Sequence, residues 1–335
     1  MASIQDVAKR ARVSTATVSH VINQNYPVSA QRRERVLRAI RELEYHPNAM
    51  ARGLRTSKSK TVGMIIPDIT NPFFPAVVRA AEDVLNHAGY ALLVGNSDNA
   101  LPKEEAYYRT FREKRVDGLL LIAAGGPFRP EYLRHHHSGD VPVVFIDRNY
   151  RGIPADSIQV DNLSGSYQAV IHLIEAGHHR VGMITGPLNL GNAKLRLEGY
   201  LHALKERKIP EDGTLIFEGK FDFRSGYERT KCLLDHNPRP TAIFVSNGEM
   251  MRGCLQALAE SAVRIPDEIA LASFDDFDWF ALGHPTITAV AQPMYDLGAV
   301  GAEILLKRIM NKLQGPPRKR ILPAKLMVRE SSEVR

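Results

Sequence analysis

Apolar positions in the first 45 residues recur at the spacing of three short helices. The first helix is expected over about 4–11, where residues at i, i+3, i+4 and i+7 share one face. A second is expected over about 15–22 and a third over about 30–43. The predicted inner faces are Ile4, Val7, Ala8 and Ala11 in the first helix, Val18, Val21 and Ile22 in the second, and Val36, Leu37, Ile40 and Leu43 in the third.

A serine stands just before each of these helices. Ser3, Ser14 and Ser29 are predicted N-caps, and Asp6 completes a capping box with Ser3. Val13-Ser14 breaks the helical pattern and places a tight turn between the first two helices. Three short helices with such a turn are typical of a helix-turn-helix unit.

The segment after the third helix changes character twice. His46-Pro47 ends the helix, because the residue before a proline avoids the α region. Asn48 can cap the next stretch, AMARGLR, which is too short to be a stable helix alone and is weakened further by Gly53. The polar TSKSK at 56–60 is typical of a linker.

From Thr61 onward, near-continuous apolar strands alternate with amphipathic helices. The expected strands are TVGMIIPDI, ALLVGNS, VDGLLLIAA, VPVVFID, RVGMITG, TLIFEGK, TAIFVSN and EIALASFDD, with a closing strand in RKRILPAKLMVRES. The expected helices are PAVVRAAEDVLNHAGY, 103–115, 165–176, 192–208, 224–236, 249–261 and 296–312. This alternation is typical of parallel sheets covered on both faces. It breaks near 150–160, so two α/β lobes are predicted, with a cleft where the loops at the strand C-termini converge.

The composition of the 335-residue chain is that of an ordinary globular protein. It is 44% hydrophobic and 24% charged, and no apolar run approaches the roughly 20 residues that cross a bilayer. The first residues, MASIQDVAKR, lack the apolar segment of a signal peptide. Cys232 and Cys254 are the only cysteines, which favours a reducing compartment. A cytoplasmic protein without a membrane partner is expected.

The charge is concentrated at the N-terminal end. The net charge of the chain is +7, but residues 1–60 hold 12 Lys and Arg against 4 Asp and Glu. The remainder of the chain is therefore slightly acidic, at −1. An ordered basic segment of this kind predicts a polyanion as its partner.

The second predicted helix, within STATVSHVIN, suits the major groove of DNA. Such a helix must be narrow and must present short polar or apolar groups. Thr15, Ala16, Ser19 and His20 are predicted on its outer face and, with Thr17, supply hydroxyls for bases or phosphates and methyl groups for thymine. The many β-branched residues make a poor isolated helix, so packing of its apolar face must hold it in place.

These motifs resemble the lactose-repressor (LacI/GalR) family of bacterial transcription factors. IQDVAKRARVSTATVSHVINQNYPVSAQRRERVLRAIRELEYHPNAMARGLR resembles the DNA-binding head of that family. TVGMIIPDITNPFF, KRVDGLLLI, ITGPLNLGNAKLRLEGY, RPTAIFVSN, IPDEIALASFDD and PTITAVAQPMYDLG resemble its regulatory core, in the right order along nearly the whole chain. The motifs are most similar to those of the ribose and purine repressor branch.

The resemblance implies an α/β fold like that of a periplasmic sugar-binding protein, preceded by a helix-turn-helix head and a hinge helix. The head is expected at 1–47, the hinge helix and linker at 48–60, and the effector-binding core at 61–335. Lobe 1 of the core is expected at about 61–160 and 291–320, and lobe 2 at about 161–290 and 321–335. A homodimer is implied, since one head reads a half-site and a two-fold dimer reads a palindromic operator in double-stranded DNA.

The resemblance also assigns DNA contacts to the head. Thr15, Ala16 and His20 match the residues that carry operator choice in the family, and Thr17 and Ser19 match contacts to bases or phosphates. The DNA-binding residues that it implies are Ser14, Thr15, Ala16, Thr17, Ser19, His20, Asn23, Tyr26, Ala51, Leu54 and Arg55. Tyr26 is a departure, because it stands where the purine-type head has a base-contacting arginine, so the operator cannot be copied from that branch.

AMARGLR matches the hinge helix, which in the family folds on the operator and enters the minor groove. Leu54 matches the leucine that wedges between the central base pairs and kinks the DNA. The unstacking that such a wedge causes must be offset by the contacts that bending adds. Gly53 is a departure, and a less helical hinge is expected to couple operator and core more weakly.

In the core, the resemblance implies an effector cleft lined by Phe73, Phe74, Asp147, Arg148, Asn192, Arg196, Phe221, Asn247 and Asp275. The chemistry suits a sugar, since aromatic faces cover C–H groups while Asp and Arg bind neighbouring hydroxyls in bidentate fashion. Arg196 and Asp275 could instead form an interlobe salt bridge, and Phe73 and Phe74 could be plain core residues.

Two departures in the cleft leave the effector open. Leu190 stands at a position that is cationic in purine- and ribose-type repressors, and Gly248 stands where an aspartate often follows the asparagine. Ribose or a purine therefore cannot be assigned as the effector of this chain from the resemblance. Arg148 together with Arg196 would also suit an acidic or phosphorylated sugar.

No catalytic residue, metal ligand or cofactor is predicted. Three adjacent histidines, His135, His136 and His137, do not face one metal site, so a surface loop is expected there. The sequence has no Gly-rich phosphate loop, no HExxH and no Ser/His/Asp elbow motif.

The sequence therefore predicts a ligand-controlled repressor of a carbohydrate-uptake or catabolism operon, acting in the bacterial cytoplasm at the nucleoid. Alternatives are a regulator that responds to a nucleobase or nucleoside and one that uses a protein corepressor. A sugar-transport protein would need a signal peptide and no basic head. An enzyme would need a catalytic constellation.

Overall fold

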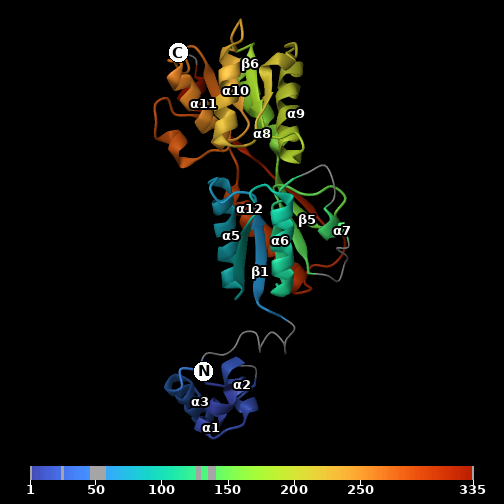
Figure 1. Cartoon of the computed structure of the whole chain (residues 1–335), viewed down its shortest axis with the longest axis vertical. Coiled ribbons are helices and arrows are strands. Elements are labelled where there is room, and N and C mark those ends of the chain that lie inside the picture. The colour runs from blue at the N-terminus through green and yellow to red at the C-terminus, as the bar shows by residue number, and fades with distance from the viewer. Residues whose placement is uncertain (1, 24–25, 46–57, 126–129, 135–140, 334–335) are drawn as a thin grey trace. The chain divides into compact units, whose positions relative to one another are not determined.

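The computed structural model describes residues 2–23, 26–45, 58–125, 130–134 and 141–333. The chain divides into two compact units, Met1–Ser59 and Lys60–Arg335, which Figure 1 shows with some of their elements labelled. The predicted hinge motif AMARGLR, including Gly53, lies outside the described residues, as do His135, His136 and His137. No helix in the described ranges is long and apolar enough to cross a membrane.

The first unit contains the helices α1 (Ile4–Ala11), α2 (Thr15–Asn23) and α3 (Ala30–Glu42), each in contact with the other two. Its core consists of Val7, Ala8, Ala11, Val18, Val21, Val36 and Ala39. The capping box is confirmed, because Ser3 Oγ accepts from Asp6 N at 3.3 Å and Asp6 Oδ2 accepts from Ser3 N at 2.8 Å. Ser14 caps α2 as predicted, since its Oγ accepts from Thr17 N at 3.2 Å.

Two predictions for α3 are wrong. Ser29 stands at the N-cap, but its side chain makes no capping hydrogen bond. Leu37 is 38% exposed, whereas Ala39 is 2% exposed. The buried face of α3 runs through Val36, Ala39 and Ile40, at i, i+3 and i+4, and Leu37 lies to one side of it.

The second unit is built on two six-stranded sheets. The first has the order β11-β5-β4-β3-β1-β2 with every pairing parallel. Its strands are β1 (Thr61–Ile66), β2 (Ala91–Asn96), β3 (Gly118–Leu121), β4 (Val143–Ile146), β5 (Asp156–Val160) and β11 (Lys319–Leu322). Helices α5 (Phe73–His87) and α12 (Met294–Ile309) cover one face and α6 (Leu101–Glu113) covers the other, while the short α7 (Glu131–Arg134) follows β3.

The second sheet has the order β12-β10-β9-β8-β6-β7, and β12 is antiparallel to β10 while the other pairings are parallel. Its strands are β6 (Val181–Thr185), β7 (Ile216–Glu218), β8 (Ala242–Val245), β9 (Ala270–Phe274), β10 (Thr288–Ala291) and β12 (Lys325–Met327). Helices α8 (Asn162–Glu175) and α9 (Gly191–Glu206) cover one face, and α10 (Phe223–Leu234) and α11 (Gly248–Glu260) cover the other. Short 3-10 turns lie at Gly213–Leu215, Asp278–Ala281 and Glu330–Ser332.

The chain passes between the two sheets three times, from β5 to α8, from β10 to α12 and from β11 to β12. Each sheet with its helices forms one lobe, and Figure 1 shows the three connections between the lobes. The loops at the C-terminal ends of the parallel strands gather at one edge of each sheet, which is where ligands bind in folds of this kind.

The predicted alternation of strands and helices is confirmed, with two differences. The pattern misses β5 (DSIQV) and β10 (TAVA), because polar and small residues weaken the apolar signal of a short strand. The predicted single closing strand is wrong, since the segment forms β11 in the first sheet and β12 in the second. Pro323 lies between them, where it lacks the N–H that a continuous strand would use.

Candidate functional site

The outer side of α2 carries short side chains, as predicted for a helix that reads DNA. They are exposed at Ser14, Thr15 and Ala16 and half-buried at Thr17 and His20. Ser19 is only 9% exposed, so its predicted place on the outer face is wrong. It lies one turn before Ile22, at the border of the apolar face, and is drawn toward the core.

Tyr26 extends this surface beyond the end of α2. It is 65% exposed, and its ring lies 5.2 Å from the His20 ring between centroids, with the planes tilted by 41°. The two rings together form an aromatic surface at the C-terminal end of the helix. The Asn23 side chain and all of Ala51, Leu54 and Arg55 lie outside the described residues.

A cavity that is partly open to solvent lies between the two lobes of the second unit. The structure brings all nine predicted cleft side chains to its wall: Phe73, Phe74, Asp147, Arg148, Asn192, Arg196, Phe221, Asn247 and Asp275. They come from the start of α5, from the ends of β4, β7, β8 and β9, and from the first two turns of α9. Residues far apart in the sequence therefore meet because parallel strands end at the same edge.

Sequence reasoning missed two residues of the wall, Asn71 and Gln292. Asn71 is 6% exposed, and its Oδ1 accepts from Phe73 N at 3.0 Å, which fixes the start of α5. Gln292 is 8% exposed and lies in the connection from β10 to α12. A polar residue directly before a proline, as in TNPF and AQPM, is the only sequence signal that both share.

The four charged groups of the cavity balance one another. Arg148 Nε lies 3.6 Å from Asp147 Oδ2, and the Arg148 guanidinium also donates to Asn99 Oδ1 at 2.8 Å. Burial raises the pKa of the Asp147 carboxyl and lowers the pKa of the Arg148 guanidinium, and the ion pair opposes both shifts. The wall holds two aspartates and two arginines and is therefore neutral overall.

Arg196 is 3% exposed, as enclosed as the two aspartates. Its Nε donates to Asn162 Oδ1 at 2.8 Å, and a terminal nitrogen donates to the Ser246 carbonyl at 2.6 Å. The guanidinium lies 3.7 Å above the Phe274 ring, close enough for a strong cation–π contact. Burial lowers the pKa of Arg196, while Asp275 and Asp147 oppose the shift. The side chain is thus held rigidly with one edge on the cavity.

The cavity also presents buried acceptors for hydroxyl or amide donors. Asp147 Oδ1 and Gln292 Oε1 have no hydrogen-bond partner among the described residues, although both atoms are buried. Asp275 Oδ2 accepts from Gly248 N at 3.1 Å, and its Oδ1 accepts from the Gln292 amide. Buried polar atoms are nearly always satisfied in native proteins, so the unpartnered oxygens favour a ligand that donates hydrogen bonds here.

Three residues of the wall have left-handed backbone conformations, with φ of 59° at Asp147, 62° at Phe221 and 75° at Asp275. Such a conformation is uncommon outside glycine and is an outlier for a residue as large as phenylalanine. Each costs on the order of 1–3 kcal/mol. All three follow the end of a strand, where the sharp change of direction turns the side chain into the cavity.

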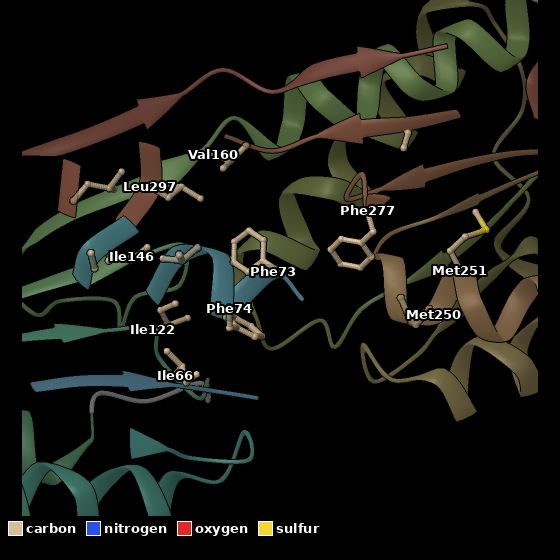
Figure 2. Close-up of a cluster of buried hydrophobic side chains, with 14 of the residues drawn as sticks. Ile66, Phe73, Phe74, Ile122, Ile146, Val160, Met250, Met251, Phe277 and Leu297 are labelled. Atoms are coloured by element: carbon tan, nitrogen blue, oxygen red, sulfur yellow. The ribbon is translucent and has the colours of Figure 1, made fainter. Parts of the chain in front are cut away.

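Aromatic rings complete the wall. Phe73 and Phe74 pack edge to face, 5.1 Å apart between centroids, and the Phe221 ring lies 5.6 Å from the Arg148 guanidinium. Phe73 and Phe74 also belong to the buried cluster that Figure 2 shows, which reaches into the second lobe at Met250, Met251 and Phe277. The two phenylalanines are therefore both core residues and cavity residues.

The Gly248 departure has a packing reason. A Cβ at residue 248 would lie 2.2 Å from Phe277 Cε2, so the phenylalanine occupies the space of any larger side chain. The Phe277 ring, which is 5% exposed, thus fills the space that a carboxylate side chain at position 248 would need. The described residues contain no group of three or more His, Cys, Asp or Glu side chains arranged to hold a metal ion.

Two protein-family models match the chain. Residues 3–48 match the one described as bacterial regulatory proteins, lacI family, and residues 170–332 match the one described as a periplasmic binding protein-like domain. The first match lies within the first compact unit and the second lies within the second unit.

Similarity to individual proteins spans both units. A ribose operon repressor of Halalkalibacterium halodurans is 36% identical over 99% of this chain and 98% of its own length. The HTH-type transcriptional repressor PurR of Proteus mirabilis is 38% identical over 93% of this chain and 92% of its own length. The crystal structure of the lac repressor dimer bound to operator and the anti-inducer ONPF has a TM-score of 0.88 at 27% identity, covering 99% of both chains.

Proposed function

The chain belongs to the lacI family of bacterial regulatory proteins, as its motifs predict, and on that premise we propose that it represses an operon for carbohydrate uptake or catabolism. It binds a palindromic operator as a homodimer and is switched by a small sugar-like effector in the interlobe cavity. One observation carries the proposal: a basic helix-turn-helix unit shares the chain with a neutral cavity of buried acceptors and aromatic rings.

DNA binding is assigned to 1–47 with the hinge at 48–60, and effector binding to 61–335. The lobes are assigned to about 61–160 with 291–320 and to about 161–290 with 321–335. Within the head, Thr15, Ala16 and His20 choose the operator sequence. The exposure of Thr15 and Ala16 supports this assignment, because a base-reading side chain must reach the groove.

Leu54→Ala is expected to weaken operator binding by about tenfold or more, since the wedge that supports the DNA bend is lost. Effector binding is expected to be unchanged, because the cavity lies wholly within the second unit. Gel-shift titration against the operator measures the first effect, with Leu101→Ala, an exposed leucine of α6, as the control. Unchanged operator affinity in Leu54→Ala would remove the wedge from the proposal.

The effector is assigned to neutral, polyhydroxylated molecules. The cavity wall is already neutral, with two arginines balanced by two aspartates, and Arg148 is paired with Asp147. A phosphate or carboxylate would therefore bring an uncompensated negative charge into a buried site, which is costly. Hydroxyl groups can donate to Asp147 Oδ1 and Gln292 Oε1 without that cost.

A thermal-shift screen of the full chain tests this assignment. The panel contains ribose, other neutral pentoses and hexoses, sugar acids, phosphosugars and purine bases. A ligand at 100 times its Kd stabilises the folded state by about 2.7 kcal/mol and raises the Tm. We expect a neutral sugar to raise the Tm. A panel in which only phosphosugars or sugar acids do so contradicts the assignment.

A second candidate effector is a nucleobase. The similarity to PurR and the aromatic faces of Phe73, Phe74 and Phe221 favour it, because flat rings stack on such faces. A Tm rise with purine bases alone would select this candidate. A change of operator affinity only in the presence of a second protein would select the protein-corepressor alternative.

Asp275→Ala is expected to remove the response to the effector while leaving operator binding intact. The substitution removes both carboxylate oxygens that organise Gly248 N and the Gln292 amide at the cavity wall. Gel shifts with and without the sugar found in the screen measure the response. A variant that still responds like the wild type would show that Asp275 has only a structural role.

The proposed protein is a regulator rather than an enzyme, in keeping with a family of regulatory proteins. A repressor of a bacterial operon acts where the chromosome is, so the cytoplasm and its nucleoid are the proposed location. The functional state requires no metal or cofactor in this proposal.

A further inference from the structure

Leu190 is not in the wall of the cavity, although Asn192 and Arg196 of the same helix are. It stands at the N-cap of α9 in the second lobe and is 5% exposed. Its side chain meets the first lobe instead. A Cβ at residue 125 would lie 2.2 Å from Leu190 Cδ2, so a larger residue at position 125 would displace the leucine side chain.

Gly125 is the last of the described residues 122–125 that follow β3. Its φ of 101° is a conformation that other residues rarely adopt. The preceding Ala124 N donates to Glu104 Oε2 at 2.6 Å, and the fully buried Glu104 also accepts from the hydroxyls of Tyr150, at 2.7 Å, and Tyr132. The leucine therefore packs next to a residue whose preceding peptide is hydrogen-bonded to a buried carboxylate.

The contact is connected to cavity residues on both sides. On the first lobe, Ala123 N donates to the Arg148 carbonyl at 3.4 Å. On the second lobe, Leu190 immediately precedes the turn of α9 that carries Asn192, whose amide donates to Asp147 Oδ2 at 3.2 Å across the two lobes. The apolar contact and this polar contact thus join the start of α9 to two neighbouring segments of the first lobe, which follow β3 and β4.

We propose that Leu190 and Gly125 form an apolar latch that holds the two lobes together and slows effector release, with Leu190 acting as a positioning residue that does not touch the effector. The proposal deepens the proposed function, and its effector readout rests on that function. In this chain position 190 then serves lobe closure through an apolar contact.

The first test needs no effector. Spin labels at Arg109→Cys on α6 and Arg224→Cys on α10, with Cys232→Ser to remove a partly exposed thiol, report the distance between the lobes in the full chain by double electron–electron resonance. Labelled protein is diluted with unlabelled protein so that each assembly holds one pair. We expect Leu190→Ala to shift the distribution to longer distances and Leu190→Met to restore it. Identical distributions for wild type and Leu190→Ala overturn the latch.

The glycine gives a double-mutant cycle. Gly125→Ala is expected to open the lobes through its clash with Leu190, and Gly125→Ala with Leu190→Ala is expected to differ little from Leu190→Ala alone. Gly177→Ala is the matched control, because Gly177 also has a positive φ, of 96°, but has nothing within 4 Å of an added Cβ. Additive effects, or an equal opening in Gly177→Ala, contradict the steric latch.

The second readout is effector kinetics with the sugar found in the screen. Leu190→Ala is expected to raise the dissociation rate by about tenfold while the association rate and the ranking of sugars change little. An unchanged dissociation rate contradicts the latch. A screen without any binding sugar contradicts the proposed effector class and leaves the spin-label result to decide on the latch.

Discussion

Replacement of Arg196 by alanine is expected to abolish effector binding and to lower the free energy of unfolding of the core by about 3–5 kcal/mol, as when one partner of a buried charge network is removed. Asn162 Oδ1 and the Ser246 carbonyl would lose their donor, and the face of Phe274 would lose the guanidinium that lies 3.7 Å above it. Asp147 and Asp275 would also lose a compensating charge.

Arg196→Lys tests the charge of this side chain separately from its shape. It keeps a cation but loses the planar fork and the stacking on Phe274, so lysine is not a conservative replacement here. We expect stability between those of the wild type and Arg196→Ala, with effector affinity still reduced by about 100-fold. Calorimetric titration with the sugar found in the screen and urea unfolding measure the two effects separately.

Operator binding by Arg196→Ala serves as the internal control, because the head has its own core of Val7, Val18 and Val36 and forms a separate compact unit. Retained operator affinity together with lost effector affinity is the expected pattern. Effector affinity within threefold of the wild type would show that Arg196 organises the wall without contacting the ligand.

The strand ends are the part of the cavity that sequence could predict. Asp147, Asn247 and Asp275 each follow an apolar strand, and parallel strands bring such positions to one edge. The family resemblance then selected the residues, and the structure places them around one cavity. The assembly follows from periodicity and topology, which are properties that a sequence pattern carries directly.

The backbone conformation of those residues could not be predicted. Asp147, Phe221 and Asp275 are left-handed, and no local signal favours that for a phenylalanine. It is imposed by packing around the turn, as at Gly186, where an added Cβ would lie 2.1 Å from the Phe221 ring. Such constraints involve residues distant in sequence and emerge only from the folded chain.

The errors in the head have a similar origin. Leu37 and Ala39 are two residues apart on α3, and hydrophobicity favours leucine as the buried one. The structure buries the smaller Ala39 at a close approach between helices, where shape outweighs side-chain size. Ser19 on α2 is buried for the related reason that it borders the apolar face.

Helices α10 and α11 pack very close to each other. A Cβ on Gly253 of α11 would lie 2.0 Å from the Phe223 carbonyl oxygen and 2.6 Å from Tyr227 N, and a Cβ on Gly226 of α10 would lie 2.1 Å from the Met250 carbonyl oxygen. The backbones of the two helices touch through this reciprocal pair of glycines. Backbone atoms cannot rotate away, so the helices themselves would have to move apart.

Gly253→Ala is therefore expected to lower the free energy of unfolding of the core by about 3 kcal/mol, at the upper end of the cost of overpacking. Gly191→Ala is the matched control, because Gly191 is also helical but an added Cβ there meets nothing within 4 Å. The control is expected to be neutral or stabilising by up to about 1 kcal/mol, since alanine favours the helix. Urea unfolding of the two variants measures the contrast, and equal stabilities would contradict the close approach.

Gly253→Ala should also change the geometry of the cavity. Phe221 lies just before α10 and Asn247 caps α11, and the Asn247 amide donates to the Phe221 carbonyl at 3.2 Å. A wider spacing of the two helices would stretch this bond and displace two wall residues together. We therefore expect Gly253→Ala to weaken effector binding even where the protein remains folded, although residue 253 is not in the cavity wall. Wild-type effector affinity in the folded variant would show that the cavity tolerates movement of the helix pair.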